Sequence, residues 1–329
     1  RARPDPSPLR PGRRNRSHGA LTMAANLTPY VEARQKKGFW LAHRFGILRR
    51  AAQLGFLALF LTGPLLGVWI AKGTLASSLT LGVLPLTDPF VLVQTLAARH
   101  WPEATALTGA GIVLAGYFLL GGRSYCAWVC PLNPVTDFAA YLRRRLGLTQ
   151  SAKLRPEFRN WLAGAAIVVS AATGFIAWEI VNPITALHRA LVFGLWFGLI
   201  PAAAIFLFDL LVAKHGWCGH ICPVGACYGA IGKASVLRVS APRRDACDDC
   251  MDCFAVCPEP QVIAPALRGG RTGASPVILA GDCTLCGACI DSCPERVFRF
   301  AHRFDTHIET VAPPVSDAPS PSPAVRQAA

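Results

Sequence analysis

Cys247-Asp-Asp-Cys250-Met-Asp-Cys253-Phe-Ala-Val-Cys257-Pro258 is the stretch that decides the fold, and its cysteine spacing occurs twice in the chain. The second copy is Cys283-Thr-Leu-Cys286-Gly-Ala-Cys289-Ile-Asp-Ser-Cys293-Pro294. In this spacing three cysteines of one copy surround one centre, and the fourth, which precedes proline, serves the centre of the other copy. The pattern therefore predicts two [4Fe-4S] clusters and one-electron chemistry. The predicted ligands are Cys247, Cys250, Cys253 and Cys293 for the first cluster, and Cys257, Cys283, Cys286 and Cys289 for the second.

Zinc is the main alternative for so many cysteines. Zinc sites use paired C-x2-C knuckles, in which a third cysteine at the next step has no role. The flanks of the two motifs are also duplicated, because Cys-Pro-Glu recurs and is followed by an apolar pair, Val262-Ile263 or Val297-Phe298. We therefore expect residues 238–304 to form a ferredoxin-like α+β domain of the bacterial two-[4Fe-4S] type, in which each cluster loop leads into a short strand.

The rest of the chain has the composition of a membrane protein. The 329 residues are 52% hydrophobic, and four apolar stretches contain a single formal charge, at Asp209; they are 51–70, 104–120, 161–178 and 190–212. A transmembrane helix needs about 20 mostly apolar residues. Helices buried in a soluble protein would instead show a polar stripe. Residues 38–237 are therefore predicted to be an α-helical membrane domain with four transmembrane helices.

The distribution of lysine and arginine predicts the orientation. Residues 1–50, the three loops between the stretches and the segment after Val212 contain 12, 2, 7, 1 and 11 of them in turn. The positive-inside rule then places both termini in the cytoplasm of a bacterium, with the chain in its inner membrane. Attraction to anionic lipid heads accounts for the net charge of +14, so nucleic acid is not needed to explain it. Residues 1–37, where Met23 is the first methionine, and 305–329 are predicted to be disordered.

The membrane domain carries a second cysteine motif, again in two copies. Each half ends in C-x3-C-P, and each has an Asp-Pro or Asn-Pro pair 38 or 36 residues before the first cysteine; the cysteines are Cys126 and Cys130, then Cys218 and Cys222. Matching features at matching offsets predict a two-fold internal repeat. The four thiols are candidates for a metal site, a redox thiol pair or a contact to a cluster, and packing of buried cysteine is the alternative. Cys227 has no counterpart and is interpreted as structural.

Residues 38–304 resemble the NapH-type membrane quinol dehydrogenase subunits of periplasmic nitrate reductase systems. The resemblance rests on the four spans, the cysteine motifs and two runs, Lys72–Phe90 and His215–Gly225. It implies that quinol from the quinone pool is oxidised at the membrane part. Electrons would then pass to a periplasmic iron–sulfur partner of the NapG type, and on to cytochromes and nitrate reductase. The route from cytoplasmic clusters to a periplasmic acceptor is left open.

Two other functions fit the same motifs. The cysteine motifs are shared with maturation proteins of copper oxidases and with regulators of nitrous-oxide reduction, so a membrane reductase for copper-centre maturation is one alternative. A non-catalytic membrane anchor for a periplasmic iron–sulfur protein is the other.

Ionisable residues beside the spans are the candidates for handling quinol protons. His188 is the first candidate, because a histidine pKa lies near neutrality, and Asp88 is the second. Glu179 and Asp209 are also ionisable residues in or beside the spans. The alternatives are structural. His188 would be hydrogen-bonded to an interfacial loop, and Asp88 and Asn182 would cap the helices that begin at Pro89 and Pro183.

Overall fold

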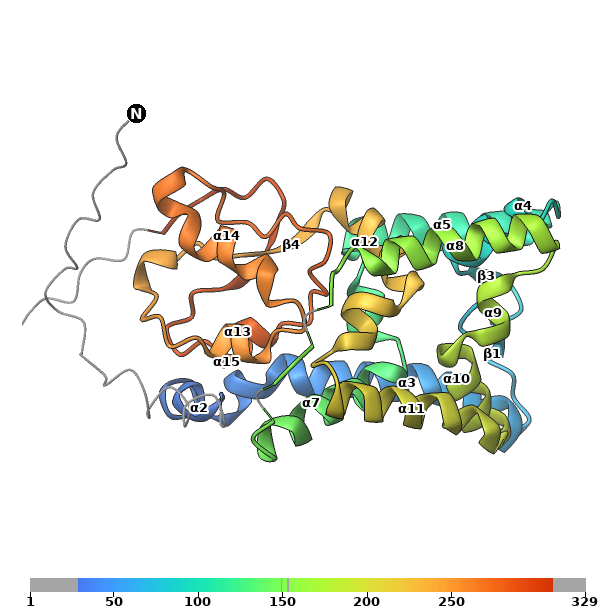
Figure 1. Ribbon diagram of the computed structural model, residues 1–329, viewed down its shortest axis with the longest axis horizontal. Helices are drawn as coiled ribbons and strands as arrows, with labels where there is room; N and C mark the ends of the chain where they lie inside the picture. The colour runs from blue at the N-terminus through green and yellow to red at the C-terminus, as the bar shows by residue number, and fades with distance from the viewer. Residues whose placement is uncertain (1–28, 149, 153, 310–329) are drawn as a thin grey trace, which may run out of the picture.

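The computed structural model describes residues 29–148, 150–152 and 154–309. Figure 1 shows two layers of helices with a separate domain at one end. The helices of the layers are α2 (Val31–Lys37), α3 (Phe39–Leu66), α4 (Pro89–Ala97), α5 (Ala104–Leu120), α6 (Ser124–Trp128), α7 (Leu132–Arg145), α8 (Phe158–Thr173), α9 (Ala177–Val181), α10 (Pro183–Phe193), α11 (Leu199–Leu211) and α12 (Pro223–Ala234). A 3-10 turn, η1 (Trp196–Gly198), precedes α11, and a π-helical turn, η2 (Trp217–Ile221), precedes α12.

The helical part is built from two similar halves. Each half contains a short helix, a longer apolar helix and a C-x3-C-P turn that leads into a further helix. The short helices α4 and α10 begin in the same way, with proline at the first position and an Asx side chain as N-cap. Asp88 Oδ1 accepts from the Phe90 amide at 2.8 Å, and Asn182 Oδ1 from the Ile184 amide at 3.0 Å. The interpretation of Asp88 and Asn182 as helix caps is confirmed.

The two halves are intertwined. The long helix α3 packs on α10 of the other half, and α8 packs in the same way on α4. In addition α3 contacts α6, which carries the first C-x3-C-P motif, and α8 contacts η2, which carries the second. Both motifs consequently lie between the two layers, next to the C-terminal domain (Figure 1).

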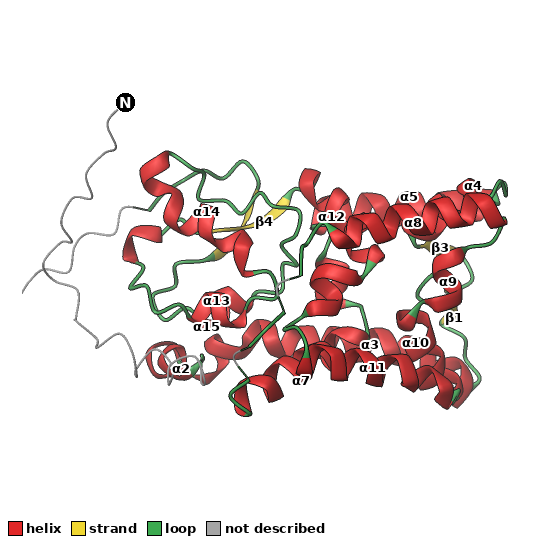
Figure 2. Cartoon of the chain, viewed as in Figure 1, coloured by secondary structure: helices red, strands yellow, loops and turns green. Residues whose placement is uncertain are grey.

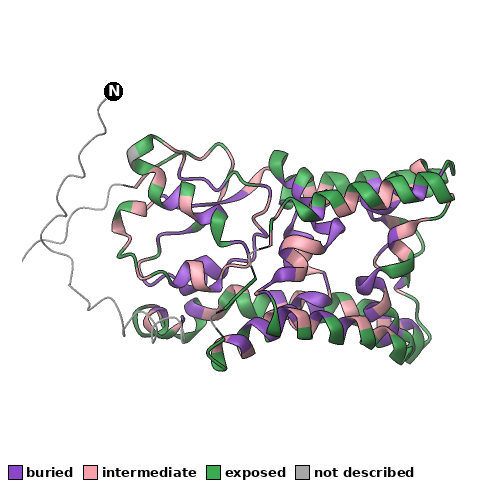
Figure 3. Ribbon diagram, viewed as in Figure 1, coloured by how far each residue is buried: buried purple, intermediate pink, exposed green. Residues whose placement is uncertain are grey.

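The helices expose apolar side chains and bury polar ones, which is the opposite of a soluble helical bundle. Figure 3 shows the outer faces of α3, α5, α8 and α11 as largely exposed, although these faces are apolar. The only residues that α5 buries are small, Gly109 and Ala110. Polar side chains lie inside instead: Gln94 and Ser170 are fully buried, and Gln94 Oε1 accepts from Ser170 Oγ and from the Trp178 amide. Small and hydrogen-bonded polar residues at helix contacts are typical of bundles in lipid.

The predicted spans agree with the helices only in part. The span 104–120 coincides with α5, whereas 51–70 lies mostly in α3, which starts earlier and ends at Leu66. The prediction of one helix over 190–212 is wrong, because Gly194 adopts φ 70° and ends α10 before α11 begins. Gly174, at φ 74°, likewise ends α8 before Trp178. Among the described helices, α3 alone is long and apolar enough to cross a bilayer by itself.

Three short strands close the end of the bundle that lies away from the C-terminal domain. They are β1 (Ala71–Gly73), β2 (Ser77–Thr80) and β3 (Leu84–Thr87), paired antiparallel in that order. They join α3 to α4, and β3 packs against α5 (Figure 1).

The C-terminal domain is mostly loop around short elements (Figure 2). Its elements are β4 (Leu237–Ser240), α13 (Asp252–Val256), α14 (Ile263–Arg268), α15 (Ala288–Ser292) and β5 (Arg299–His302). Strands β4 and β5 pair antiparallel, with Leu237 opposite His302. The predicted strand after the second motif is β5, but the one at Val262-Ile263 is wrong, since Val262 ends a 3-10 turn, η4 (Pro260–Val262), and Ile263 begins α14.

The two predicted disordered ends are partly ordered. Residues 31–37 form α2, and the Lys37 ammonium donates to the Ile290 and Asp291 carbonyls at 2.9 Å. At the other end the Glu309 amide donates to the Pro242 carbonyl at 2.9 Å. Residues 1–28 and 310–329 lie outside the described residues.

Candidate metal centres

The two ferredoxin-type motifs share an unusual backbone. Asp249 and Leu285, at equivalent positions, have φ 56° and 51°, and Met251 and Gly287, also equivalent, have φ 64° and 72°. Left-handed residues at these positions curl each loop before the third cysteine, which lies in α13 or α15. The same bend in both copies supports the duplication that was predicted from the sequence.

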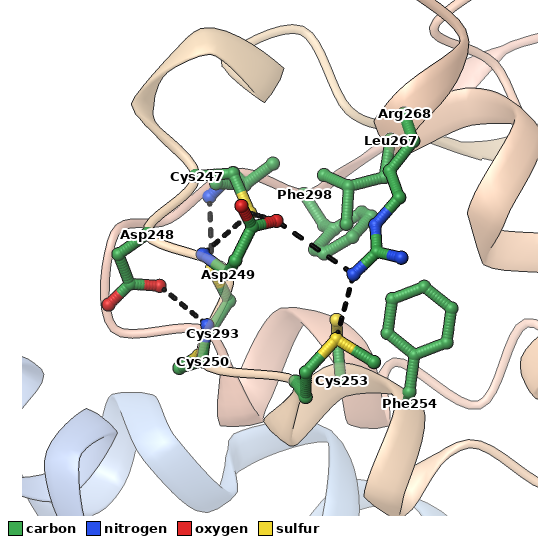
Figure 4. Close-up of a pocket in the computed structure, with 12 residues that line it drawn as sticks. Cys247, Asp248, Asp249, Cys250, Cys253, Phe254, Leu267, Arg268, Cys293 and Phe298 are labelled. Atoms are coloured by element: carbon green, nitrogen blue, oxygen red, sulfur yellow. Dashed lines mark hydrogen bonds and ion pairs between the residues drawn. The ribbon is translucent and has the colours of Figure 1, made fainter. Parts of the chain in front are cut away.

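Four of the cysteines line one pocket: Cys247, Cys250 and Cys253 of the first motif, and Cys293 of the second. Figure 4 shows them with Phe254, Leu267 and Phe298, which form the apolar wall. Backbone amides already point at two of the sulfurs, because Asp249 donates to Cys247 and Val297 to Cys293, both at 3.4 Å. Burial raises the pKa of Cys247 to about 11 and that of Cys253 to about 12. A metal must therefore displace protons from these thiols when it binds.

The other four cysteines lie near one another, and one of them, Cys286, packs with Ala127 of the helical layers. They are Cys257 from the end of α13, and Cys283, Cys286 and Cys289. Burial, and after it the neighbouring Cys286 and Cys283, raise the pKa of Cys257. The structure thus places Cys293 in one pocket with the first three cysteines of the other motif, and Cys257 near Cys283 and Cys286. The assignment of the eight cysteines to two clusters stays a prediction.

The cysteines of the two C-x3-C-P motifs also meet. Cys126, Cys130, Cys218 and Cys222 line a second pocket, whose wall contains Tyr125, Trp217, Leu132, Ile184 and Val224. Cys126 lies in α6 and Cys218 in η2, while Cys130 and Cys222 lie just before α7 and α12. Cys227 lies in α12 and is not part of this wall.

Among the described residues, no three His, Cys, Asp or Glu side chains converge closely enough to hold a single metal ion. In a cubane cluster each sulfur has its own iron atom, so the ligands stand around a larger body than one ion.

The first C-x3-C-P motif touches the loop of the second ferredoxin-type motif. Trp128, inside the first C-x3-C-P motif, donates its indole N–H to the Leu285 carbonyl at 3.1 Å. Ala127 and Trp128 also pack with Cys286 and Ala288. This contact joins residues 157 positions apart in the sequence, and sequence reasoning did not find it.

A buried ionic network holds the same junction together. Arg123 donates to Glu259 Oε1 at 2.6 Å, to the Asp282 carbonyl at 3.0 Å and to the Cys218 carbonyl at 2.8 Å. Arg159 donates to the Gly219 carbonyl at 3.0 Å and forms ion pairs with Glu259 and Asp282. The sequence analysis missed this network, although Glu259 stands in the repeated Cys-Pro-Glu. Its counterpart Glu295 is half-exposed and pairs with Lys36 instead.

The candidate proton residues lie elsewhere, in the short helices. His188 in α10 is 1% exposed, and the edge of the Phe60 ring meets it with centroids 4.6 Å apart. Neither of its ring nitrogens has a hydrogen-bond partner among the described residues, so the alternative of a loop-bonded histidine is wrong. Asp88 caps α4, and no hydrogen bond or ion pair joins it to His188 in the described part of the chain.

Glu179 and Asp209 have structural partners. Glu179 accepts from Asn182 Nδ2 at 3.0 Å, and Asp209 accepts from the Trp217 amide at 2.9 Å.

Comparison with known proteins agrees with both cysteine patterns. A family model described as a 4Fe-4S binding domain matches twice, at residues 104–149 and 195–242, in agreement with the predicted internal repeat. A second model, described as a 4Fe-4S dicluster domain, matches residues 246–297. No solved structure matches.

Relatives that match nearly their whole length are ferredoxin-type proteins. "Ferredoxin-type protein NapH" of Haemophilus influenzae is 50% identical over 83% of this chain and 95% of its own, and that of Escherichia coli is 49% identical over 84% and 95%. "Methylamine utilization ferredoxin-type protein MauN" of Methylorubrum extorquens is 51% identical over 81% and 92%. The chain therefore belongs to the family of ferredoxin-type iron–sulfur proteins that contains NapH and MauN.

Proposed function

We propose that the chain is a membrane electron-transfer subunit that oxidises quinol and passes electrons toward a periplasmic nitrate reductase. The observation that supports the proposal is a pocket lined by Cys247, Cys250, Cys253 and Cys293, together with the closeness of Cys257 to Cys283 and Cys286. Each set would hold one [4Fe-4S] cluster, which accepts and gives electrons singly. The first set is Cys247, Cys250, Cys253 and Cys293, and the second is Cys257, Cys283, Cys286 and Cys289.

The exposed apolar surfaces of the helices support a location in the bacterial inner membrane. Apolar faces of α5, α8 and α11 are exposed, and such large apolar surface needs a cover. The turns around the C-x3-C-P motifs are largely buried between helices, where irregular backbone is tolerated at membrane depth. We propose that both termini, and therefore the C-terminal domain, face the cytoplasm.

His188 and Asp88 are the residues that we propose for quinol. Oxidation of a quinol releases two electrons and two protons, so a proton acceptor must stand beside it. An imidazole with two buried nitrogens and no hydrogen-bond partner in residues 29–148, 150–152 and 154–309 has an unsatisfied capacity for hydrogen bonds, and a buried polar group of this kind needs an explanation. A quinol hydroxyl would satisfy one nitrogen of His188.

The partners follow from the relatives by analogy. NapH relatives suggest an iron–sulfur partner of the NapG type, followed by cytochromes and nitrate reductase. The similarity to MauN, which is as high, favours a second candidate, an equivalent electron-transfer role in methylamine utilisation.

Reduction of the clusters by quinol tests the proposal. The full chain, prepared anaerobically, should show electron paramagnetic resonance signals of reduced clusters after addition of a quinol. His188→Gln should abolish or slow their appearance while dithionite still produces them, whereas His302→Gln, at an exposed position in β5, should behave like the unchanged chain. Clusters that dithionite reduces and quinol does not would contradict quinol oxidation.

A further inference from the structure

We propose that two lysines of the helical part, Lys37 and Lys214, raise the reduction potentials of the two iron–sulfur clusters, one lysine for each cluster. This inference rests on the proposed electron-transfer function and adds to it two residues that are not ligands. A quinol is a mild reductant, so a cluster that takes electrons from it needs a comparatively high potential. Net charge, hydrogen bonds and burial around the sulfurs set the potential of a cluster.

The two lysines reach the C-terminal domain at equivalent points of its two motifs. The Lys37 ammonium, at the end of α2, donates to the Asp291 carbonyl at 2.9 Å, and α2 lies next to α15 (Figure 1). The Lys214 ammonium, between α11 and η2, donates to the Ala255 carbonyl. Each carbonyl belongs to the residue midway between the third and the fourth cysteine of its motif. The contact is therefore duplicated, although the two lysines come from unrelated parts of the chain.

Both carbonyls lie in the last turn of a short helix, α13 or α15. The last four carbonyls of a helix have no partner within it, and a lysine side chain can bind them. In each motif the fourth cysteine, Cys257 or Cys293, follows directly after the helix. Each lysine therefore binds the segment that leads into the cysteine predicted to serve the cluster of the other motif.

The positive charges lie beside these two cysteines. Lys37 is close enough to Cys293 to interact with it electrostatically, and Lys214 is as close to Cys257. Both lysines are half-buried, and neither forms an ion pair with a carboxylate in residues 29–148, 150–152 and 154–309. The Asp291 side chain, which also lies near Lys37, accepts from backbone amides of α3.

These charges favour the reduced form of each cluster. A cluster bound by four thiolates is an anion, and it gains one more negative charge when it accepts an electron. A nearby cation stabilises the more negative form. Cys293 is a predicted ligand of the first cluster and Cys257 of the second, so Lys37 should act on the first cluster and Lys214 on the second.

Redox titration of the full chain, prepared anaerobically and followed by electron paramagnetic resonance, tests this inference without quinol. Lys37→Met removes the charge and keeps a side chain of similar shape, so the midpoint potential of one cluster should shift to a more negative value. Lys214→Met should shift the potential of the other cluster, and the double variant should shift both. Lys37→Arg and Lys214→Arg keep the charge and should stay close to the unchanged chain.

A neighbouring lysine supplies the matched control. Lys36 is exposed and pairs with Glu295, so Lys36→Met should leave both potentials unchanged. Lys37→Gln and Lys214→Gln separate charge from hydrogen bonding, because a neutral amide can still donate to the carbonyl. Their potentials should follow those of the methionine variants. The glutamine variants also carry the test if a methionine variant does not keep its clusters.

Unchanged potentials in the variants of Lys37 and Lys214 that lack the charge would overturn the inference. A shift of the same size in Lys36→Met would also overturn it, because any nearby charge would then suffice. The outcome is separate from that of the proposed function. Clusters that quinol reduces, with potentials that do not depend on the lysines, would contradict this inference alone, whereas shifted potentials in clusters that quinol does not reduce would contradict quinol oxidation alone.

Discussion

Glu259 is the residue on which the junction between the helical layers and the C-terminal domain depends. It is 1% exposed and accepts from both Arg123 and Arg159. Glu259→Gln keeps the shape but leaves two buried cations with one carboxylate, Asp282. Removing one partner of a buried ion pair costs about 3–5 kcal/mol. We expect a large drop in thermal stability in detergent, together with a loss of iron.

The repeat supplies a matched control for this substitution. Glu295→Gln removes the equivalent glutamate, whose half-exposed pair with Lys36 is worth about 0–1 kcal/mol. Its melting temperature should stay close to that of the unchanged chain. Equal melting of the two variants would show that the buried network does not hold the domains together.

Trp128 is the residue whose side chain connects the two kinds of cysteine motif. Trp128→Phe keeps an aromatic ring but deletes the hydrogen bond to Leu285, which is worth about 0.5–1.5 kcal/mol. Cluster content should therefore remain, while quinol reduces the ferredoxin-type clusters more slowly in stopped-flow absorbance measurements. Trp161→Phe, at an exposed position in α8, should leave that rate unchanged. A reduction rate in Trp128→Phe equal to that of the unchanged chain would show that Trp128 takes no part in electron transfer.

The sequence predicted contacts between residues that are close together in the chain better than contacts between residues that are far apart. The cluster cysteines follow one another within a few residues, so their spacing alone predicted the set of four that lines one pocket. Arg123 and Glu259 are 136 positions apart, and no local pattern reports that they meet. The partnership of the two C-x3-C-P motifs was only suggested by the repeat, because their convergence is a property of the intertwined helices.

At the scale of elements, hydropathy predicted where helices occur and not where they end. The stretch 190–212 is apolar apart from Asp209 near its end, so its break at Gly194 has no hydropathy signal. The break is set by backbone conformation, since Gly194 has φ 70° and its amide donates to the Ala190 carbonyl as a C-cap. Pro201 lies in the first turn of α11, where proline is tolerated.

This explanation predicts the effect of a methyl group at two glycines. Gly194→Ala should lower stability by about 1 kcal/mol, because alanine is strained at positive φ. Gly164→Ala, within α8, should be neutral or stabilising because alanine is the better helix former. An added Cβ meets nothing within 4 Å at either site, so the two variants differ in backbone conformation and not in space. Equal melting temperatures of the two variants would show that the positive φ of Gly194 is not what ends α10.

At the scale of the molecule, the two ends of the bundle differ in a way that predicts its orientation. The C-terminal domain and the arginine-rich end of α7 lie at one end, and the hairpin of β2 and β3 lies at the other (Figure 1). Because lysine and arginine remain on the cytoplasmic side, the hairpin should face the periplasm.

Reporter insertions in the full chain, expressed in a bacterium, measure this orientation. Alkaline phosphatase, which is active only after export, should be active when inserted after Gly82, in the exposed turn between β2 and β3. The same insertion after Gly147, an exposed residue that follows α7, is the matched control and should be inactive. A green fluorescent protein fused after Ala329 should fluoresce, because it folds in the cytoplasm. Phosphatase activity at Gly147 with none at Gly82 would reverse the orientation, and would place the iron–sulfur domain on the same side as the periplasmic acceptor.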